Sequence, residues 1–426
     1  MVAEVYMWGS RIGVVMQEDV TDIPKFSYTD DFLQSGIEVS PLMMPLARRM
    51  YSFPALSKES FHGLPGLLAD SLPDRYGTKL IERYLIEQGK TLEQFTAVER
   101  LCYVGKRGMG ALEYIPAKGY SDIADSTIQL DALVKLASDI LTEKESVHIR
   151  ENDCVMRQII KIGTSAGGAR AKAIVAWNEE TKDIRSGQIE AGLGYDYWLI
   201  KFDGVRNNKD HGDKEDGPGY TNIEYAYYLM AKAAGIEMSE CRLFEDGGYQ
   251  HFMTKRFDRQ SPNGKKIHMQ TLGALAHFDY NLPGAYAYEQ VGDIIYRLGM
   301  GQREIEQFYR RMVFNVLAKN QDDHVKNTSF LMNMKGDWAL SPAYDITYAY
   351  DPTNYWLSKH QMSINGKVEN ITKQDLLDCG KRMNISKMRS TKIIEDVGEK
   401  IEKWLSYAEQ AKVKEQTAEM IQKNLK

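Results

Sequence analysis

The stretch from Ile305 to Asn327 constrains the fold more than any other part of this 426-residue chain. Apolar residues recur at helical spacing from Ile305 to Leu317, which predicts an amphipathic helix with one buried face. A polar loop, Asn320 to Asn327, follows this helix directly. The helix is the clearest of several in the C-terminal part of the chain, which we expect to be mainly helical.

Within this loop, Asp322 and Asn327 lie five residues apart. In the catalytic loop of a phosphoryl-transfer enzyme, an Asp accepts the proton of the attacking hydroxyl, and an Asn at this distance reaches a magnesium ion on the phosphates. Both residue types are also common in ordinary polar turns, so the spacing alone is weak evidence. Motifs elsewhere in the chain are needed to choose between a catalytic loop and an ordinary polar turn.

The bulk composition excludes several classes of protein. The chain is 43% hydrophobic and 27% charged, as globular proteins are, and no apolar run approaches the ~20 residues needed to span a bilayer. The N-terminus lacks a basic segment followed by an apolar one, so nothing indicates secretion. We therefore expect a cytoplasmic protein that does not associate with membranes.

Cysteine spacing and net charge exclude further classes. The four cysteines are far apart and form no C-x-x-C pair, which argues against a zinc site and a disulfide framework and favours buried thiols. The net charge of −5 gives no general attraction to nucleic acid. Direct nucleic-acid binding by this chain alone is therefore not expected.

We predict three segments: an N-terminal subdomain (1–120), a β-rich lobe (121–265) and a helical lobe (266–426). The first opens with a hairpin of two short strands, 4–8 and 12–16. The β-rich lobe is expected to contain strands at 170–177, 195–202 and 250–257. The predicted fold class is α+β.

The order of the candidate functional residues gives more information than any one of them. A small-residue loop between two strands is followed by a strand lysine, a helix glutamate, another strand, the polar loop, a hairpin and a further Asp. This is the order of parts in a two-lobed protein kinase, in which catalysis rests on positioning and charge neutralisation. The residues concerned are Lys201, Glu224, Asp322, Asn327 and Asp345.

Two of these residues have an ordinary alternative role. Lys201 ends an apolar strand, so we expect it to contact the phosphates of a nucleotide, whereas an edge-strand lysine would reach solvent. Glu224 could form an ion pair with Lys201, as the helix glutamate does in protein kinases. It could equally complete a capping box with Thr221.

Residues near the polar loop have similar alternatives. Asp345 follows a strand and suits a metal-binding carboxylate, although it could also be a helix N-cap. His324 could donate a hydrogen bond to a phosphate or bond the loop backbone. We expect Asp323 and Lys326 to solvate or brace the loop.

The small-residue loop from Thr164 to Ala169 matches neither familiar phosphate-binding fingerprint. Gly168 is followed by Ala169 and Arg170, where a Walker A loop needs Lys and then Ser or Thr, and there is no G-x-G-x-x-G pattern. Backbone N–H groups of small residues can still approach a phosphate, and Ser165 adds a hydroxyl. An ordinary β-turn is the competing interpretation.

Taken together, these motifs resemble the HipA family of serine/threonine kinases, the toxin halves of bacterial toxin–antitoxin pairs. The resemblance covers nearly the whole length and implies a two-lobed protein-kinase-like fold with a HipA-type N-terminal subdomain. The segments that carry it are 165–172 (SAGGARAK), 199–201 (LIK), 255–259 (KRFDR), 322–329 (DDHVKNTS) and 341–346 (SPAYDI).

The resemblance also implies a role for each matching residue. Asp322 is expected to be the catalytic base, and Asn327 and Asp345 to hold Mg²⁺. The residues expected to contact ATP are Ser165, Ala166, Lys201, Lys255, Arg256, Phe257, Gln270 and His324.

Ser165 matches the family's autophosphorylated serine. A phosphate there adds close to two negative charges beside the nucleotide site, which should repel ATP and inactivate the enzyme.

Three features depart from the family pattern. Asp323 replaces a glycine of the usual Asp-Gly-His loop, and its carboxylate could alter metal affinity or face solvent. Arg170 stands where Gln is frequent. The insertion from Asp203 to Tyr220 is longer than expected, which leaves the substrate-facing surface in doubt.

The partners implied are a small DNA-binding, HipB-like antitoxin and a protein substrate in translation, such as an aminoacyl-tRNA synthetase. Repression of transcription would then act through the antitoxin. Two other functions remain open: a small-molecule kinase of the same fold, and an inactive ATP-binding partner of a DNA-binding antitoxin.

Overall fold

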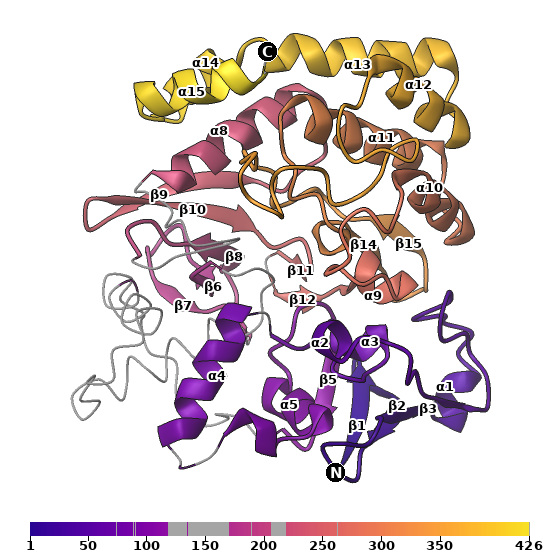
Figure 1. Ribbon diagram of the computed structural model, residues 1–426. Helices are drawn as coiled ribbons and strands as arrows, with labels where there is room; N and C mark the ends of the chain where they lie inside the picture. The colour runs from indigo at the N-terminus through magenta and orange to yellow at the C-terminus, as the bar shows by residue number, and fades with distance from the viewer. Residues whose placement is uncertain are drawn as a thin grey trace.

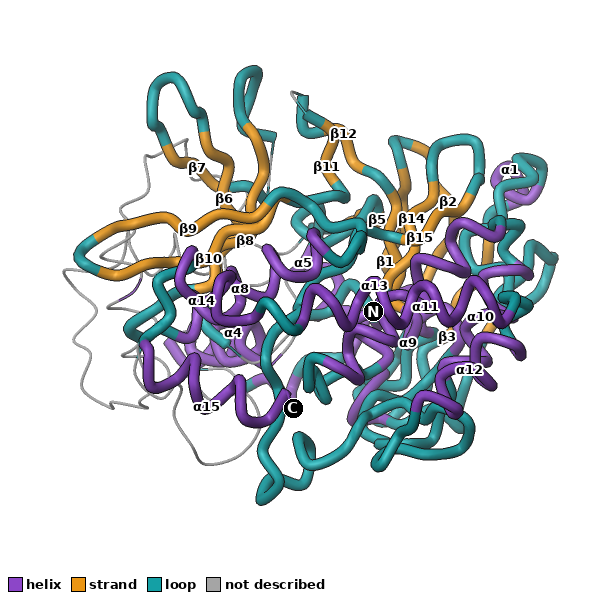
Figure 2. Tube along the Cα trace, turned by 90° about the horizontal axis from the view of Figure 1, so that it is seen from above, coloured by secondary structure: helices purple, strands orange, loops and turns teal. Residues whose placement is uncertain are grey.

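A computed structural model of the chain describes residues 1–73, 75–87, 89, 91–117, 134, 170–188, 190–205, 219–261 and 263–425. Helices of the C-terminal part form a layer along one side of the molecule, and the strand-rich parts lie below it (Figure 1). The described strands form four sheets: an N-terminal sheet, a second sheet within residues 172–255, a three-stranded sheet within residues 268–340, and the short pair β11 (Arg259–Gln260) and β12 (Lys265–Lys266) (Figure 2). This architecture confirms the predicted α+β fold. No helix within the described ranges is long and apolar enough to cross a membrane.

The N-terminal unit is built on a five-stranded antiparallel sheet of order β4-β3-β2-β1-β5. Its first two strands form the predicted hairpin, and alternate residues of β1 (Ala3, Val5 and Met7) are buried. The strands are β1 (Val2–Met7), β2 (Ser10–Met16), β3 (Lys25–Tyr28), β4 (Met50–Tyr51) and β5 (Leu112–Ile115). The helices are α1 (Asp30–Leu33), α2 (Lys58–Phe61), α3 (Gly66–Ala69), α4 (Arg75–Glu87), η1 (Leu92–Gln94) and α5 (Ala97–Val104).

The second sheet is antiparallel throughout, with order β7-β6-β8-β10-β9. Every residue of β6 is buried, and Tyr76 and Leu80 of the N-terminal helix α4 belong to the same apolar core. A strand covered on both faces has no need for polar alternation, which explains its continuous apolar run. The strands are β6 (Lys172–Trp177), β7 (Ile184–Ser186), β8 (Asp196–Lys201), β9 (Cys241–Asp246) and β10 (Tyr249–Lys255).

Helix α8 (Tyr220–Ala233) joins this sheet to the helical lobe. Its N-cap is Gly219, and the hydroxyl of Thr221 donates instead to the carbonyl of Gln250, at 2.5 Å. The predicted capping box between Thr221 and Glu224 is therefore wrong. The hydroxyl of Tyr227 donates to the carbonyl of Ala318, at 2.7 Å, which fixes the helix beside the end of α11.

The helical lobe surrounds the largest apolar core, to which α8 also contributes. Its central helix, α11 (Gln302–Leu317), buries the apolar face predicted from the sequence, including Ile305, Phe308, Met312 and Val316. A three-stranded sheet lies beside it: β13 (His268–Thr271), β14 (Ser329–Met332) and β15 (Trp338–Leu340). The other helices are α9 (Leu272–Ala276), α10 (Tyr288–Arg297), η3 (Val325–Asn327), α12 (Lys373–Arg382), α13 (Lys387–Ile401), α14 (Trp404–Gln410) and α15 (Glu415–Leu425).

The cysteines of the described residues are unpaired thiols, as predicted. Cys102, Cys241 and Cys379 are buried, and burial raises the pKa of the Cys241 thiol to about 12. Cys154 lies outside the described residues.

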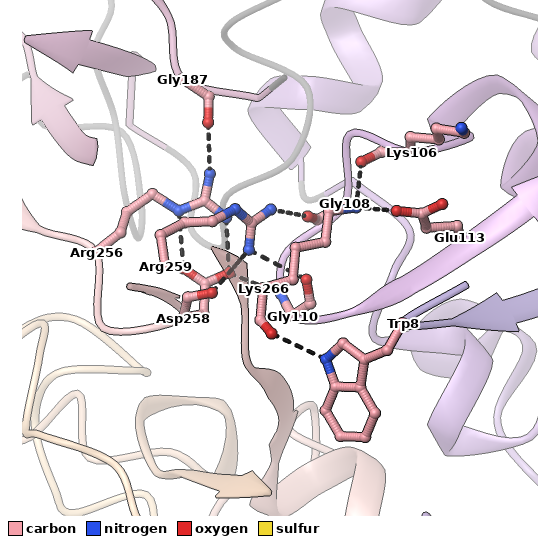
Figure 3. A network of polar contacts seen from close by, with 10 residues as sticks. All are labelled: Trp8, Lys106, Gly108, Gly110, Glu113, Gly187, Arg256, Asp258, Arg259 and Lys266. Carbon is pink, nitrogen blue, oxygen red and sulfur yellow. Dashed lines mark hydrogen bonds and ion pairs between the residues drawn. The ribbon is translucent and has the colours of Figure 1, made fainter. Parts of the chain in front are cut away.

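A buried ionic cluster connects the second sheet to the N-terminal unit (Figure 3). Asp258 accepts hydrogen bonds from the guanidinium groups of Arg256 and Arg259 and from the backbone N–H of Gly110, all within 2.7–2.8 Å. Arg256 also donates to the carbonyl of Gly187, at 3.0 Å. The two guanidinium groups hold the pKa of Asp258 below its usual range against the opposing effect of burial.

Candidate active site

The polar loop after α11 is held in place by its own backbone. The N–H of Asn320 donates to the carbonyl of Asn315, at 3.0 Å, and the N–H of Gln321 donates to the carbonyl of Ala349, at 2.9 Å. The first bond ties the loop to α11, and the second ties it to the segment that follows β15. The loop therefore enters the site in a fixed register.

Asp322 and Asn327 are joined across the loop. The side-chain amide of Asn327 donates from Nδ2 to the backbone carbonyl of Asp322, at 2.7 Å. Because that bond uses the donor end of the amide, Oδ1 is the atom of Asn327 suited to a cation. The Asp322 side chain keeps 17% of its surface exposed, so its carboxylate is accessible to a reacting group.

Of the two roles foreseen for His324, the structure shows the hydrogen bond to the loop backbone. Its Nδ1 accepts a hydrogen bond from the backbone N–H of Lys326, at 3.2 Å, and so caps the short helix η3. An acceptor at Nδ1 places the ring proton on Nε2, which lies 3.8 Å from Oδ1 of Asp322. His324 thus braces the loop backbone and presents an N–H on the side of the candidate base.

Asp345 is brought to this loop by its neighbour Tyr344. The Tyr344 hydroxyl donates to the carbonyl of Lys326, at 2.6 Å, and lies 2.5 Å from the hydroxyl of Ser329. Burial raises the pKa of Tyr344, so the hydroxyl keeps the proton that it donates. Asp345 itself has a left-handed backbone, φ 52°, which Asp tolerates better than most residues.

Lys201 connects the two lobes at this point. Its ammonium group donates to Oε1 of Glu224, at 2.6 Å, and forms a second ion pair with Oδ1 of Asp345. Burial disfavours the charge on Lys201, but the two carboxylates outweigh burial and raise the pKa of the lysine. Burial also raises the pKa of Glu224, against the attraction of Lys201. Of the two roles foreseen for Glu224, the structure shows the ion pair.

The small-residue loop with Ser165 and Ala166 lies outside the described residues. The chain after it enters β6, whose first residue, Lys172, is the register partner of Lys201. Arg170 stacks on the ring of Tyr220, with its guanidinium carbon 3.4 Å from the ring centroid. Residues 170–172, which follow the small-residue loop, therefore lie at the same end of the second sheet as Lys201.

The three residues from Lys255 to Phe257, which are expected to contact ATP, lie in different environments. Lys255 donates to Oδ2 of Asp196, at 2.7 Å, and Arg256 belongs to the buried ionic cluster. The ring of Phe257 lies 5.7 Å from that of Tyr344, between centroids. Phe257 is therefore the member of this trio that adjoins the Asp345 segment.

Gln270 is fully buried, and its amide is committed elsewhere. Its Nε2 donates to the carbonyl of Val39 in the N-terminal unit and lies 2.9 Å from Nε2 of His268. The structure places Gln270 at the junction with the N-terminal unit, where its amide nitrogen is used in a protein contact.

Asp323 neither faces solvent nor joins the other carboxylates. Its side chain is 1% exposed and accepts hydrogen bonds from the Tyr288 hydroxyl, from Nδ1 of His360 and from the backbone N–H of Gln361. The two alternatives foreseen from the sequence, altered metal affinity and a solvent-facing carboxylate, have no support in this geometry. The bracing role is the one observed.

The ligand set at the site suits magnesium. Within the described part of the chain no group of three His, Cys, Asp or Glu side chains is arranged to hold a metal. Asp345 and Asn327 instead offer one carboxylate and one amide oxygen. Mg²⁺ is commonly bound by one or two such oxygens together with water and substrate phosphates, so this set fits it.

Comparison with known proteins identifies the family. A model described as the HipA-like C-terminal domain matches residues 164–405, and one described as the HipA N-terminal domain matches residues 3–115. The chain belongs to the HipA family. The predicted resemblance is thereby confirmed, and both HipA domains are present.

A solved structure of HipA from Shewanella oneidensis shows the same fold over almost the whole length. That structure, a complex of HipA, HipB and operator DNA, aligns with a TM-score of 0.69 and 16% sequence identity, and the alignment covers 99% of this chain and 95% of the other. At this identity the match establishes the fold of the HipA-family chain.

Two sequence relatives are named as kinases. A Sinorhizobium fredii protein named "Putative kinase Y4dM" is 28% identical over 180 residues, which cover 34% of this chain and 42% of the relative. A Haemophilus influenzae protein named "Putative kinase" is 30% identical over 148 residues, which cover 31% of this chain and 42% of the relative. This chain thus spans less than half the length of either relative.

Proposed function

We propose that this HipA-family chain is a Mg-ATP-dependent serine/threonine protein kinase that acts as the toxin of a toxin–antitoxin pair. The observation that carries the proposal is the Lys201 ammonium between Glu224 and Asp345, a site that the Tyr344–Lys326 hydrogen bond connects to the loop of Asp322 and Asn327. A lysine, a helix carboxylate, a candidate base and two oxygen ligands are the parts that phosphoryl transfer needs. The names of the two sequence relatives support kinase activity.

In the proposed reaction, Asp322 accepts the proton of a substrate serine or threonine hydroxyl. The hydroxyl oxygen forms a bond to the γ-phosphorus, the bond to the β,γ-bridging oxygen breaks, and ADP leaves with that electron pair. Lys201 and His324 neutralise and orient the phosphate oxygens. Backbone N–H groups around Ser165 and Ala166 contact the phosphates, and the segment from Lys255 to Phe257 contacts adenine.

Asn327 and Asp345 would hold Mg²⁺, which supplies charge neutralisation on the transferring phosphate when it is bound. Lys201 already pairs with Asp345, so the phosphate of an incoming nucleotide meets a cation and a metal ligand that are adjacent.

Ser165 is the proposed site of inactivating autophosphorylation. A phosphoserine there would add close to two negative charges, and it would compete with ATP for the cations that hold the phosphates. The proposed partner is a small DNA-binding, HipB-like antitoxin, as suggested by the HipA–HipB–DNA complex of the structural relative. The proposed substrate is a protein of translation, such as an aminoacyl-tRNA synthetase.

Substitution of the candidate base tests the reaction. Asp322→Asn keeps the shape of the side chain but removes the proton acceptor, so we expect phosphate transfer from Mg-[γ-³²P]ATP to protein to fall by about 10²- to 10⁴-fold. Induced expression should then no longer arrest growth. Wild-type rates and growth arrest in the Asp322→Asn chain would show that Asp322 is not the base.

A second experiment separates a protein kinase from a small-molecule kinase and identifies the autophosphorylated residue. The purified chain, incubated with Mg-ATP, is expected to gain one phosphate at Ser165, identified by peptide mass spectrometry. Ser165→Ala should remain unmodified and keep its activity on added protein. Transfer to metabolites without any transfer to protein would favour the small-molecule alternative. A phosphate found only at other residues would exclude inactivation by phosphorylation of Ser165.

A further inference from the structure

Asp323 is the residue next to the candidate base, and its carboxylate is turned into the protein. Three groups donate to this carboxylate: the Tyr288 hydroxyl at 2.8 Å, Nδ1 of His360 at 2.8 Å and the backbone N–H of Gln361 at 2.7 Å. A carboxylate accepts hydrogen bonds, so the proton in the histidine contact lies on Nδ1 of His360. All three contacts bridge residues that are 35 to 38 positions apart in sequence.

On one side these contacts reach the helices that carry the loop. The Tyr288 hydroxyl, at the start of α10, also accepts a hydrogen bond from Nδ2 of Asn315 in α11, at 3.0 Å. Oδ1 of Asn315 accepts in turn from Nδ2 of Asn320, at 3.0 Å. A continuous polar chain therefore leads from α11 through α10 to Asp323.

On the other side the contacts reach the segment 349–363, which follows Asp345 and runs beside the loop. Its beginning is bonded to the loop by the N–H of Gln321, which donates to the carbonyl of Ala349. Its end is bonded by His360 and Gln361 to Asp323. The contacts of Asp323 therefore tie the far end of this segment to the residue next to Asp322.

We infer that Asp323 is a positioning residue that fixes Asp322 by locking the catalytic loop between α10 and the segment 349–363. The inference rests on the proposed function of Asp322 as the base. Asp322 and Asp323 share a peptide unit, so a rotation of that unit after loss of the lock moves the base as well. Misplacement of a catalytic group by ~1 Å is enough to cost about 100-fold in rate.

The lock should act on the chemical step and not on nucleotide binding. Two of the residues that hold the phosphates and metal in the proposed function, Lys201 and Asp345, lie outside the loop, and Tyr344 connects them to it. The other two, His324 and Asn327, lie in the loop and keep their own bonds to the Lys326 N–H and the Asp322 carbonyl. Removal of the lock should therefore lower the rate of transfer at saturating Mg-ATP much more than it changes the half-saturating ATP concentration. A residue with a purely structural role would lower the melting temperature without this separation.

The experiment measures single-turnover phosphate transfer from Mg-[γ-³²P]ATP to the full-length chain itself, across a range of ATP concentrations. For Asp323→Ala we expect a rate about 10- to 100-fold below wild type at saturation, with half-saturation within about twofold. Asp323→Asn keeps an oxygen for Gln361 and should recover part of the rate. His360→Asn keeps a donor near the position of Nδ1 and should be faster than His360→Leu, which has none.

Asp375 provides a matched control in the same lobe. It is another buried carboxylate, 4% exposed, and it accepts hydrogen bonds from Thr372, Asn365 and Lys367 at the start of α12. Asp375→Ala should lower the melting temperature as Asp323→Ala does, but it should leave the transfer rate within about twofold of wild type.

The outcomes separate the inference from the proposed function. If wild type transfers phosphate and Asp322→Asn does not, the function stands, and a wild-type rate in Asp323→Ala then overturns the lock alone. A loss of ATP affinity in Asp323→Ala with an unchanged saturated rate overturns it equally. If Asp323→Ala fails to fold, the comparison of His360→Leu with His360→Asn decides, and equal rates in those two variants overturn the lock. Phosphate transfer retained by Asp322→Asn contradicts the proposed function itself.

Discussion

At the scale of single residues, the charge balance around Lys201 is the most unusual feature of the molecule. One buried ammonium group faces two carboxylates, and Glu224 is only 2% exposed. Buried charges are costly unless they are paired, so Lys201 stabilises the charged forms of Glu224 and Asp345. In the proposed function, nucleotide binding and stability would therefore depend on the same ammonium group.

We predict that Lys201→Ala destabilises the chain by about 3–5 kcal/mol, because the variant leaves a buried carboxylate without its cation. Burial raises the pKa of Glu224, and loss of the lysine raises it further. An acid with a raised pKa loses stability as pH rises through that value, so the deficit of the variant should be larger at pH 8 than at pH 5. Urea unfolding at both pH values measures it.

The double variant Lys201→Ala/Glu224→Gln is the control for this prediction. Replacement of the carboxylate by an amide removes the unpaired charge, so the double variant should be more stable than Lys201→Ala at pH 8 and should lose most of the pH dependence. Equal stability of the two variants at both pH values would contradict the assignment of the effect to Glu224.

The sequence predicted the residues of the site whose roles come from local patterns. Asp322 and Asn327 have a fixed spacing, and the structure joins them by a hydrogen bond within one loop. Asp323 could be predicted only to brace the loop, because its partners Tyr288 and His360 are 35 and 37 residues away. Long-range side-chain contacts leave no periodic signal in one sequence.

At the scale of elements, α12 and α13 are in contact within the helical layer (Figure 1), and each helix contains one glycine. A Cβ at Gly380 of α12 would press on the Ser390 hydroxyl and lie 3.1 Å from the Tyr309 ring. A Cβ at Gly398 of α13 would meet no atom within 4 Å. The two positions differ in packing and share a helical backbone.

We predict that Gly398→Ala stabilises the chain by about 0.5–1 kcal/mol, because alanine loses less backbone entropy in a helix. At Gly380 the same gain is opposed by overpacking, which costs typically about 1–3 kcal/mol, so Gly380→Ala should be destabilising. Thermal melting of the two variants beside wild type gives the comparison. A higher melting temperature for Gly380→Ala would show that α12 and α13 separate easily.

The sequence predicted elements well where pattern and environment agree, and less well where the environment overrides the pattern. The amphipathic helix from Ile305 to Leu317 is observed as α11, because its apolar stripe faces a large core. The Thr221–Glu224 pattern suggested a capping box, but Glu224 instead lies one turn inside α8 and pairs with Lys201. The Glu224 side chain forms an ion pair with Lys201 of β8 and does not cap its own helix.

At the scale of the whole molecule, the N-terminal unit is joined to the rest by buried polar contacts. Asp70 accepts from the N–H of Thr271 at 2.6 Å, and the backbone N–H of Gly66 donates to Nε2 of His277 at 3.0 Å. The cluster of Arg256, Asp258 and Arg259 adds charged contacts to the same junction. Polar junctions of this kind depend on the protonation state of their members.

The junction should therefore weaken in mild acid. Burial lowers the pKa of His268 and of His277 from 6.5 to about 4, so both are neutral in the folded chain. A histidine with a lowered pKa contributes stability above its unfolded value of 6.5, and that contribution is lost as pH falls toward 4. Protonation of His277 also removes the acceptor of the Gly66 N–H.

His277→Asn cannot titrate, so its melting temperature should fall less than that of wild type between pH 7 and pH 5, by roughly 2 °C. An identical fall in both proteins would place the acid-sensitive contacts outside this junction.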